Sequence, residues 1–274
     1  MKDNNKPLFT AANLVKGIAI GSAMLVPGLS GGTIAIICGI YDKLLAAVAS
    51  IRQNPKKNLA FLAAVAIGGI IGMLLFSKII LLLFQTYQMP VMFFFIGAVL
   101  GSIPMLYRCT QIKRFSYHMI LYPAIGIVFV ILMIFIPENT FIIEVTHIQD
   151  YALLLLIGIF LAVALVLPGI SFSYMLLIMG IYESALTAIQ EMQILYLSLL
   201  GAGIVIGIIL ISKMFKALLT RYPKETYLMI IGFVLASLKD VFPGLPNAEN
   251  LLICIATLLI GFLLIFFLSK KYTR

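Results

Sequence analysis

The stretch PGLSGGT at residues 27–33 interrupts a strongly apolar part of the chain, and a second version, PGISFSY, lies at residues 168–174. Proline and glycine end a helix, and the serine that follows them can cap the next one. Two successive glycines in the first copy also let a ligand approach the backbone closely. The sequence therefore predicts a helix break at each position, with a new helix starting just after it.

The composition places these two breaks in a membrane. Among the 274 residues, 63% are hydrophobic and only 11% are charged, and the mean hydropathy is +1.16. This composition is typical of an integral membrane protein, and the long continuous apolar runs predict helices rather than the alternating strands of an outer-membrane barrel. Because Lys16 and Pro27 interrupt the first apolar run, we expect no cleaved signal peptide.

The charge distribution predicts the topology. The net charge of +9 comes from basic residues in short loops, so it indicates orientation in the membrane rather than a nucleic-acid partner. The loops at 52–58, 108–116 and 213–225 and the C-terminal tail are basic, whereas residues 137–150 contain three acidic residues and no Lys or Arg. We therefore predict that the basic loops and both termini are cytoplasmic and that the acidic loop is external.

The two halves of the sequence repeat each other. At an offset of 141 residues, Gly17, Pro27, Gly28, Ser30, Gly39, Ile40, Tyr41, Leu45 and Ala47 match Gly158, Pro168, Gly169, Ser171, Gly180, Ile181, Tyr182, Leu186 and Ala188. After a six-residue deletion the offset becomes 135, and Gly68, Gly72, Ser77, Lys78, Tyr87, Gly97, Leu100 and Ser102 match Gly203, Gly207, Ser212, Lys213, Tyr222, Gly232, Leu235 and Ser237. Internal repeats of this length indicate a duplicated fold.

The loop charges fit this repeat only if each motif segment enters and leaves the membrane on one side. We therefore predict an all-α integral membrane protein with two inverted-topology repeats, each a re-entrant helical hairpin plus three transmembrane helices. The first repeat, residues 1–137, has its hairpin at 11–51 and spans at about 59–84, 91–107 and 117–136; the second, residues 151–268, has its hairpin at 151–190 and spans at about 194–219, 226–239 and 250–268. Ten full spans have the same parity, but the run at 14–26 is shorter than the roughly 20 residues that a span needs.

Each predicted break places a helix N-terminus, with free N–H groups and a positive dipole end, inside the membrane, where it favours a phosphate. The first copy suits an anion better, and the second lines or closes the cavity. The alternative is that the Pro-Gly and Gly-Gly pairs only permit a kink or close helix packing. The candidate phosphate-binding residues are Ser30, Gly31, Gly32, Thr33, Ser171, Phe172, Ser173 and Tyr174, and the turn residues are Pro27, Gly28, Pro168 and Gly169.

Two carboxylates follow the breaks at equivalent positions. Asp42 and Glu183 each come directly after a Gly-Ile-Tyr sequence, in which Tyr41 and Tyr182 are the tyrosines. An intramembrane carboxylate is by default functional, so these residues are candidates for ion coupling or gating. The alternative is that both carboxylates lie at the membrane interface, with Asp42 beside Lys43.

Other chemistry-bearing residues are few. Lys78 recurs as Lys213, and Lys78 would lie nearer the exterior, where it could attract an anionic headgroup. Cys38, Cys109 and Cys254 show no metal-ligand spacing. Because the sequence also lacks a Walker loop and a Ser-His-Asp pattern, it predicts no metal, no cofactor and no catalytic residues.

The pieces VPGLSGGT with GIYDKLL, and LPGISFS with GIYES, resemble the polyprenyl-phosphate transporter family of bacterial and archaeal membrane proteins, and the resemblance runs from about residue 14 to 268. It implies a flippase that returns undecaprenyl phosphate, the carrier lipid of cell-wall synthesis, from the outer to the inner leaflet of the bacterial cytoplasmic membrane. It further implies that the phosphate binds where the two hairpins meet while the prenyl tail stays in lipid. A gradient of H⁺ or Na⁺, or the membrane potential, would drive this transport; the sequence indicates neither the coupling ion nor the oligomeric state.

Two alternatives belong to other functional classes. Undecaprenyl-pyrophosphate phosphatases use a similar motif, but Gly31 and Phe172 stand where their phosphate-clamping Arg would be, and no E-x-x-x-E pattern accompanies the motif. An enzyme without these groups lacks the means to hold and cleave a pyrophosphate. The other alternative is a transporter of a soluble anion, which would need a closed hydrophilic cavity rather than a groove open to lipid.

Overall fold

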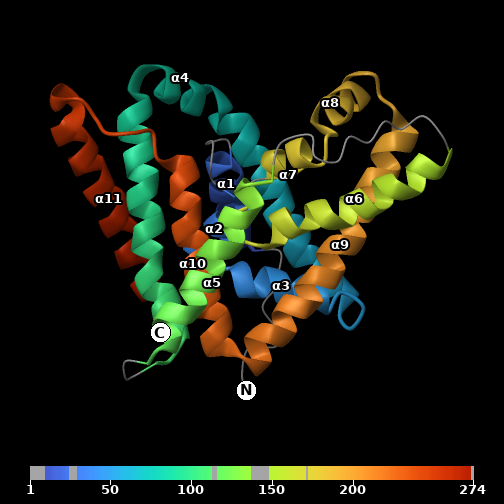
Figure 1. Cartoon of the computed structure of the whole chain (residues 1–274), viewed down its shortest axis with the longest axis horizontal. Coiled ribbons are helices and arrows are strands. Elements are labelled where there is room, and N and C mark those ends of the chain that lie inside the picture. The colour runs from blue at the N-terminus through green and yellow to red at the C-terminus, as the bar shows by residue number, and fades with distance from the viewer. Residues whose placement is uncertain (1–9, 25–29, 113–115, 137–147, 171, 273–274) are drawn as a thin grey trace.

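The computed structural model describes residues 10–24, 30–112, 116–136, 148–170 and 172–272, and this part of the chain contains eleven α-helices and no strand (Figure 1). The helices are α1 (Ala11–Ala23), α2 (Gly31–Ile37), α3 (Tyr41–Ala49), α4 (Pro55–Cys109), α5 (His118–Ile134), α6 (Ile148–Val166), α7 (Phe172–Ile178), α8 (Tyr182–Gln190), α9 (Ile194–Arg221), α10 (Pro223–Val241) and α11 (Ala248–Tyr272).

Long apolar helices confirm the predicted class, an all-helical membrane protein, for the described residues. Four stretches are long and apolar enough to cross a membrane: Pro55–Ile80, Leu82–Cys109, Ile194–Arg221 and Ala248–Leu268. α2 and α3 together would make a fifth, but they are bent by 117° relative to one another. The predicted spans at 117–136 and 226–239 correspond to α5, which has only 17 residues, and to α10, which carries charged residues at both ends.

α4 consists of two helices joined at Tyr87, where the backbone leaves helical geometry with φ −135° and ψ 43°. We call the residues before and after Tyr87 the first and second parts of α4. Tyr222, 135 residues later, has similar backbone angles, φ −132° and ψ 60°, and separates α9 from α10. The second offset of the sequence repeat therefore relates two turns of the same local shape.

The short helices after the two breaks also match. α2 and α3 have the same lengths as α7 and α8, and each pair begins and ends 141 residues apart. Gly39 lies in the elbow between α2 and α3, and Gly180 lies in the elbow between α7 and α8, with φ of +64° and +65°. Glycine adopts this left-handed conformation without the steric cost that other residues meet, so it sets the elbow in both halves.

Glycines mark the closest helix contacts, and these contacts repeat as well. A β-carbon at Gly17 of α1 would overlap the carbonyl oxygen of Val65 in α4, and one at Gly158 of α6 would overlap that of Leu200 in α9. Small residues let helix backbones approach in this way, so both halves use the same packing. The other matched contacts are Gly68 with Leu14 and Gly203 with Leu155, Gly97 with Leu258 and Gly232 with Pro123, and Gly261 with Phe94 and Gly126 with Met229.

The last helix of each half packs against the other half. α1 lies against the first part of α4, and α6 lies against α9. In contrast, α5 lies against α10, and α11 lies against the second part of α4. The two predicted repeats therefore exchange their final helices, and they form one packed molecule rather than two separate units.

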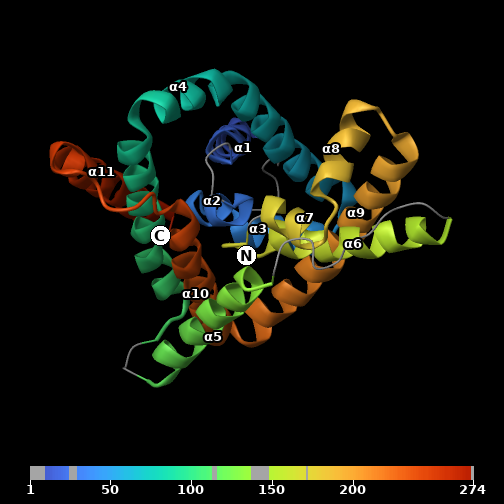
Figure 2. The ribbon, with the colours of Figure 1, turned by 45° about the horizontal axis from the view of Figure 1, so that its top comes forward.

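Both views of the molecule place α2 and α7 near its centre, with α4 curving around α1 (Figures 1 and 2). In Figure 1 the α3–α4 and α9–α10 connections lie at the lower edge, whereas the bend of α4 and the α8–α9 and α10–α11 connections lie at the upper edge. The lower connections fall in the basic stretches 52–58 and 213–225, while the upper connections at 191–193 and 242–247 contain no Lys or Arg. Basic and non-basic connections therefore lie on opposite sides.

The glycine contacts predict a sharp difference between two nearby substitutions in α9. A β-carbon at Gly203 would overlap the Leu155 carbonyl, whereas one at Gly201 would have no atom within 4 Å. We expect Gly203→Ala to lower the free energy of unfolding in detergent by about 1–3 kcal/mol, as overpacking typically does, and Gly201→Ala to leave it nearly unchanged. Thermal unfolding of the two purified variants checks this, and equal shifts in both would contradict it.

Candidate substrate-binding site

The two helix breaks meet at the centre of the molecule. The Gly169 amide donates a hydrogen bond of 3.1 Å to the Ser30 hydroxyl, although 139 residues separate them in sequence. A β-carbon at Gly32 would lie 3.2 Å from the backbone of Pro168, tighter than most such contacts, so a glycine favours the close approach of the two segments. The structure thus brings Ser30 and Gly32, which the sequence assigned to a phosphate site, against Pro168 and Gly169, which it assigned to the turn of the second motif.

Ser30 also organises the start of α2. Its hydroxyl accepts a hydrogen bond from the Thr33 amide at 3.2 Å, the geometry of an N-cap, and lies 2.8 Å from the Thr33 hydroxyl. Thr33 is only 1% exposed, so its hydroxyl contacts Ser30 from the buried side and is itself out of reach of a ligand. Gly32 is also buried, whereas Ser30 and Gly31 are half-buried. Of these four candidates, Ser30 and Gly31 are therefore the ones that a ligand could touch.

The second break is packed more tightly than the first. Pro168, Gly169 and Ile170 are all buried. A β-carbon at Gly169, whose φ is +85°, would overlap the Phe233 carbonyl of α10. Phe172 and Tyr174 are half-buried, and the Tyr174 hydroxyl donates to the Ile136 carbonyl at 3.1 Å. Among the other predicted site residues, Pro27, Gly28 and Ser171 lie outside the described residues, as does the side chain of Ser173.

Tyr41 anchors the second break. Its buried hydroxyl donates a hydrogen bond of 3.0 Å to the carbonyl of Val166, at the C-terminal end of α6. The last carbonyls of a helix have no partner within the helix, and leaving one unpaired in an apolar interior costs free energy. This contact ties the first half to the second, and the gating or coupling role that the sequence predicts for Tyr41 stays a prediction. Its repeat equivalent, Tyr182, is half-buried.

Asp42 forms a further connection between the halves. Tyr227 of α10 donates a hydrogen bond of 2.6 Å to the Asp42 carboxylate, and both residues line a small cavity of about 40 Å³ with Cys109. The residue 135 positions before Tyr227 is Met92, which has no hydroxyl to offer Glu183. Sequence reasoning missed Tyr227 for this reason, since the repeat gave no signal there.

The equivalent short helices α3 and α8, which we call the short arms, also differ in their packing. α3 lies against α9 of the other half, whereas in the described part of the chain α8 has no comparable contact with α4. Glu183, at the start of α8, and Lys78, in α4, are both exposed. Besides the contacts described above, α3 therefore joins the halves in the lower part of the view in Figure 1, whereas the described residues show no comparable contact at α8 in its upper part.

Ser30 offers a direct test of how much the contact between the breaks contributes. In Ser30→Ala the Thr33 and Gly169 amides lose their shared acceptor, so we expect the free energy of unfolding to fall by about 1–3 kcal/mol. Ser22→Ala is the matched control, because the Ser22 hydroxyl bonds only within its own helix, to the Ile18 carbonyl at 2.6 Å. Thermal unfolding in detergent measures both, and a Ser30→Ala variant as stable as the control would contradict the bridging role.

Comparison with known proteins supplies a family for this arrangement. The family model described as VCA0040-like, undecaprenyl phosphate translocase-like, matches residues 20–257. A polyprenyl-phosphate transporter of Staphylococcus aureus is 33% identical over 270 residues, which cover 93% of this chain and 94% of the relative. A polyprenyl-phosphate transporter of Vibrio cholerae is 31% identical over 244 residues, which cover 84% of this chain and 76% of the relative. No solved structure matches. The chain therefore belongs to the VCA0040-like family of undecaprenyl phosphate translocase-like membrane proteins.

Proposed function

We propose that this protein is a flippase that returns undecaprenyl phosphate from the outer to the inner leaflet of the bacterial cytoplasmic membrane, where the lipid re-enters cell-wall synthesis. The observation that carries the proposal is the contact between the two helix breaks through Ser30 and Gly169, in a chain whose relatives are named polyprenyl-phosphate transporters. A polar contact between broken helices inside an apolar protein is a place where a phosphate can leave water.

The phosphate would bind on the exposed side of this contact, beside Ser30 and Gly31. Ser30 supplies a hydroxyl, Gly31 supplies accessible backbone, and the start of α2 supplies a positive dipole end. The second motif, with Phe172, Ser173 and Tyr174, would form the opposite wall. The end of the Met24 side chain lies beside Gly31 and is flexible enough to move aside.

The topology follows from the sides on which the loops lie. The basic connections at the lower edge of Figure 1 would face the cytoplasm, together with both termini, and the connections without Lys or Arg would face the exterior. The bend of 117° between α2 and α3 suits a re-entrant hairpin. With the matching bounds of α7 and α8, it supports two inverted repeats whose hairpins enter from opposite sides.

Transport would then alternate between two states, and the contact that one half makes in the first state would be made by the other half in the second. In this structure α3 joins α9 and Asp42 bonds Tyr227. If the basic connections are cytoplasmic, as proposed, this contact closes the cytoplasmic side and the site would open toward the exterior. In the inward-facing state α8 would pack against α4 and α3 would separate from α9. A proton or sodium ion at Asp42 or Glu183 would couple this exchange to a gradient.

Reconstitution in liposomes tests the proposed function. We expect the protein to move labelled undecaprenyl phosphate between leaflets, and Ser30→Val or Gly32→Val to slow it by at least about ten-fold, because the first removes a hydrogen bond to a charged group and the second forces the breaks apart. Gly201→Val is the control, since its side chain would meet open space. Wild-type rates in both site variants, with normal insertion, would refute the site.

The coupling group is tested by the pH dependence of the same assay. We expect Asp42→Asn to remove the variation of transport rate with pH, because an amide cannot take up a proton, and Tyr227→Phe to alter the profile without abolishing transport. Glu183→Gln provides the repeat-matched comparison. Unchanged profiles in both carboxylate variants would show that neither residue carries a proton, and a matching sodium series separates the two ions.

A further inference from the structure

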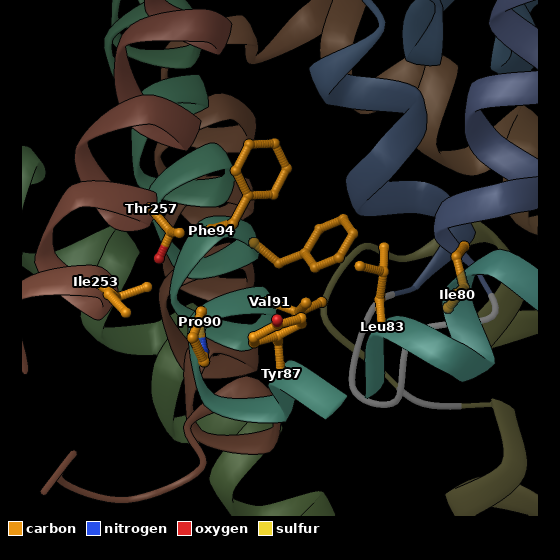
Figure 3. Close-up of a pocket in the computed structure, with 9 residues that line it drawn as sticks. Ile80, Leu83, Tyr87, Pro90, Val91, Phe94, Ile253 and Thr257 are labelled. Carbon is orange, nitrogen blue, oxygen red and sulfur yellow. The ribbon is translucent and has the colours of Figure 1, made fainter. Parts of the chain in front are cut away.

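An apolar pocket of about 420 Å³ lies in the bend of α4 (Figure 3). Ile80 and Leu83 of the first part of α4 form one wall, Val91 and Phe94 of the second part form another, and α11 closes the side with Ile253 and Thr257. The volume falls in the range of about 300–1,000 Å³ that is usual for small-molecule sites. The Thr257 hydroxyl is already bonded to the Cys254 carbonyl at 3.0 Å, so it offers a ligand little polar contact.

The pocket exists because α4 is broken here. Tyr87 leaves helical geometry, and Pro90 lacks the N–H that would continue the helix ladder, so the two parts of α4 diverge and leave space between them. Leu83 and Ile253 are substantially exposed at its edge, so an apolar chain can enter from the surrounding lipid.

The second half provides an internal comparison. The same break occurs at Tyr222, but the repeat equivalents of Ile253 and Thr257 are His118 and Tyr122, whose rings stack at 5.6 Å with an interplanar angle of 6°. The equivalents of Pro90 and Val91 are the polar residues Glu225 and Thr226. The two halves therefore differ at these equivalent positions. One half has a stacked pair of rings there, and the other, at the edge without basic connections, has an open apolar pocket.

We propose that this pocket binds a segment of the prenyl chain of polyprenyl phosphate, which enters sideways from the outer leaflet while the phosphate approaches the helix breaks. The inference rests on the proposed function and adds a recognition site for the tail. A prenyl chain is favoured over a straight acyl chain because its double bonds restrict its torsions, so ordering it costs less entropy. Its methyl branches and alkene faces also fill a wide pocket walled by Tyr87, Phe94 and branched side chains better than a straight chain does.

The first experiment fills the pocket. Leu83→Trp and Ile253→Trp place a large ring in it, while the neighbouring Leu82→Trp and Leu252→Trp place the same ring on surface that is 63% and 78% exposed and outside the pocket. In liposomes we expect the two pocket variants to move undecaprenyl phosphate about ten-fold more slowly than the two controls, because each excludes an apolar segment from burial. Equal rates in variants and controls would overturn the inference, whereas absence of transport by the unaltered protein would overturn the proposed function instead.

The second experiment detects the chain directly and does not depend on transport. The protein contains no Trp, so Phe94→Trp, with Tyr87→Trp as a second variant, introduces a single reporter in the pocket. In vesicles of phospholipid with brominated acyl chains, we expect geranylgeranyl phosphate to protect this Trp from quenching and to leave the Leu252→Trp control unchanged. Hexadecyl phosphate, whose straight chain has the same main-chain length, should protect at least about ten times more weakly. Equal protection by both phosphates, or none by either, would overturn the inference.

Discussion

The hydrogen bond between the Gly169 amide and the Ser30 hydroxyl is the contact on which the centre of the protein depends. A helix that breaks inside lipid must find partners for its freed backbone groups within the protein, because no water is available there. Here the first half supplies them to the second: Ser30 accepts the amide after Pro168, and Tyr41 donates to the Val166 carbonyl before it. Glycine at position 32 allows the approach. The first half therefore helps to stabilise the second break, and a polar centre arises in a chain with few charges.

That centre sits between halves that share a scaffold but differ in their contacts. The repeated glycines give both halves the same close helix packing, so this part of the structure is fixed by backbone approach rather than by particular side chains. The differences lie in the short arms, where α3 reaches α9 and Asp42 reaches Tyr227. Within the described ranges, the Asp42–Tyr227 bond has no equivalent in the other half, because Met92 stands where a hydroxyl would be needed to reach Glu183.

Much of this could be predicted from the sequence, because the repeat and the helix-breaking residues are local signals. The offsets of 141 and 135 predicted matching segments, and α2, α3, α7 and α8 have matching bounds, as do the turns at Tyr87 and Tyr222. What could not be predicted depends on contacts between distant segments. Tyr227 meets Asp42 from another helix, and its repeat equivalent, Met92, carries no hydroxyl. The hydrogen bond from the Tyr41 hydroxyl to the Val166 carbonyl likewise joins segments 125 residues apart. The pocket in the bend of α4 needs α11, more than 160 residues away, to close it.

The exchange of final helices also constrains how the protein is made. α5 packs mainly against α10, which begins almost 90 residues after α5 ends, and the second part of α4 packs against α11, the last helix of the chain. During synthesis, Gly97 and Gly126 must therefore sit in the bilayer without the backbones that they will later contact. Such late, long-range contacts slow folding and prolong the exposure of unpaired surfaces. A chain cut between the halves would leave both products with unmatched glycine surfaces, so recovery of the fold from two fragments requires each to find the other in the membrane.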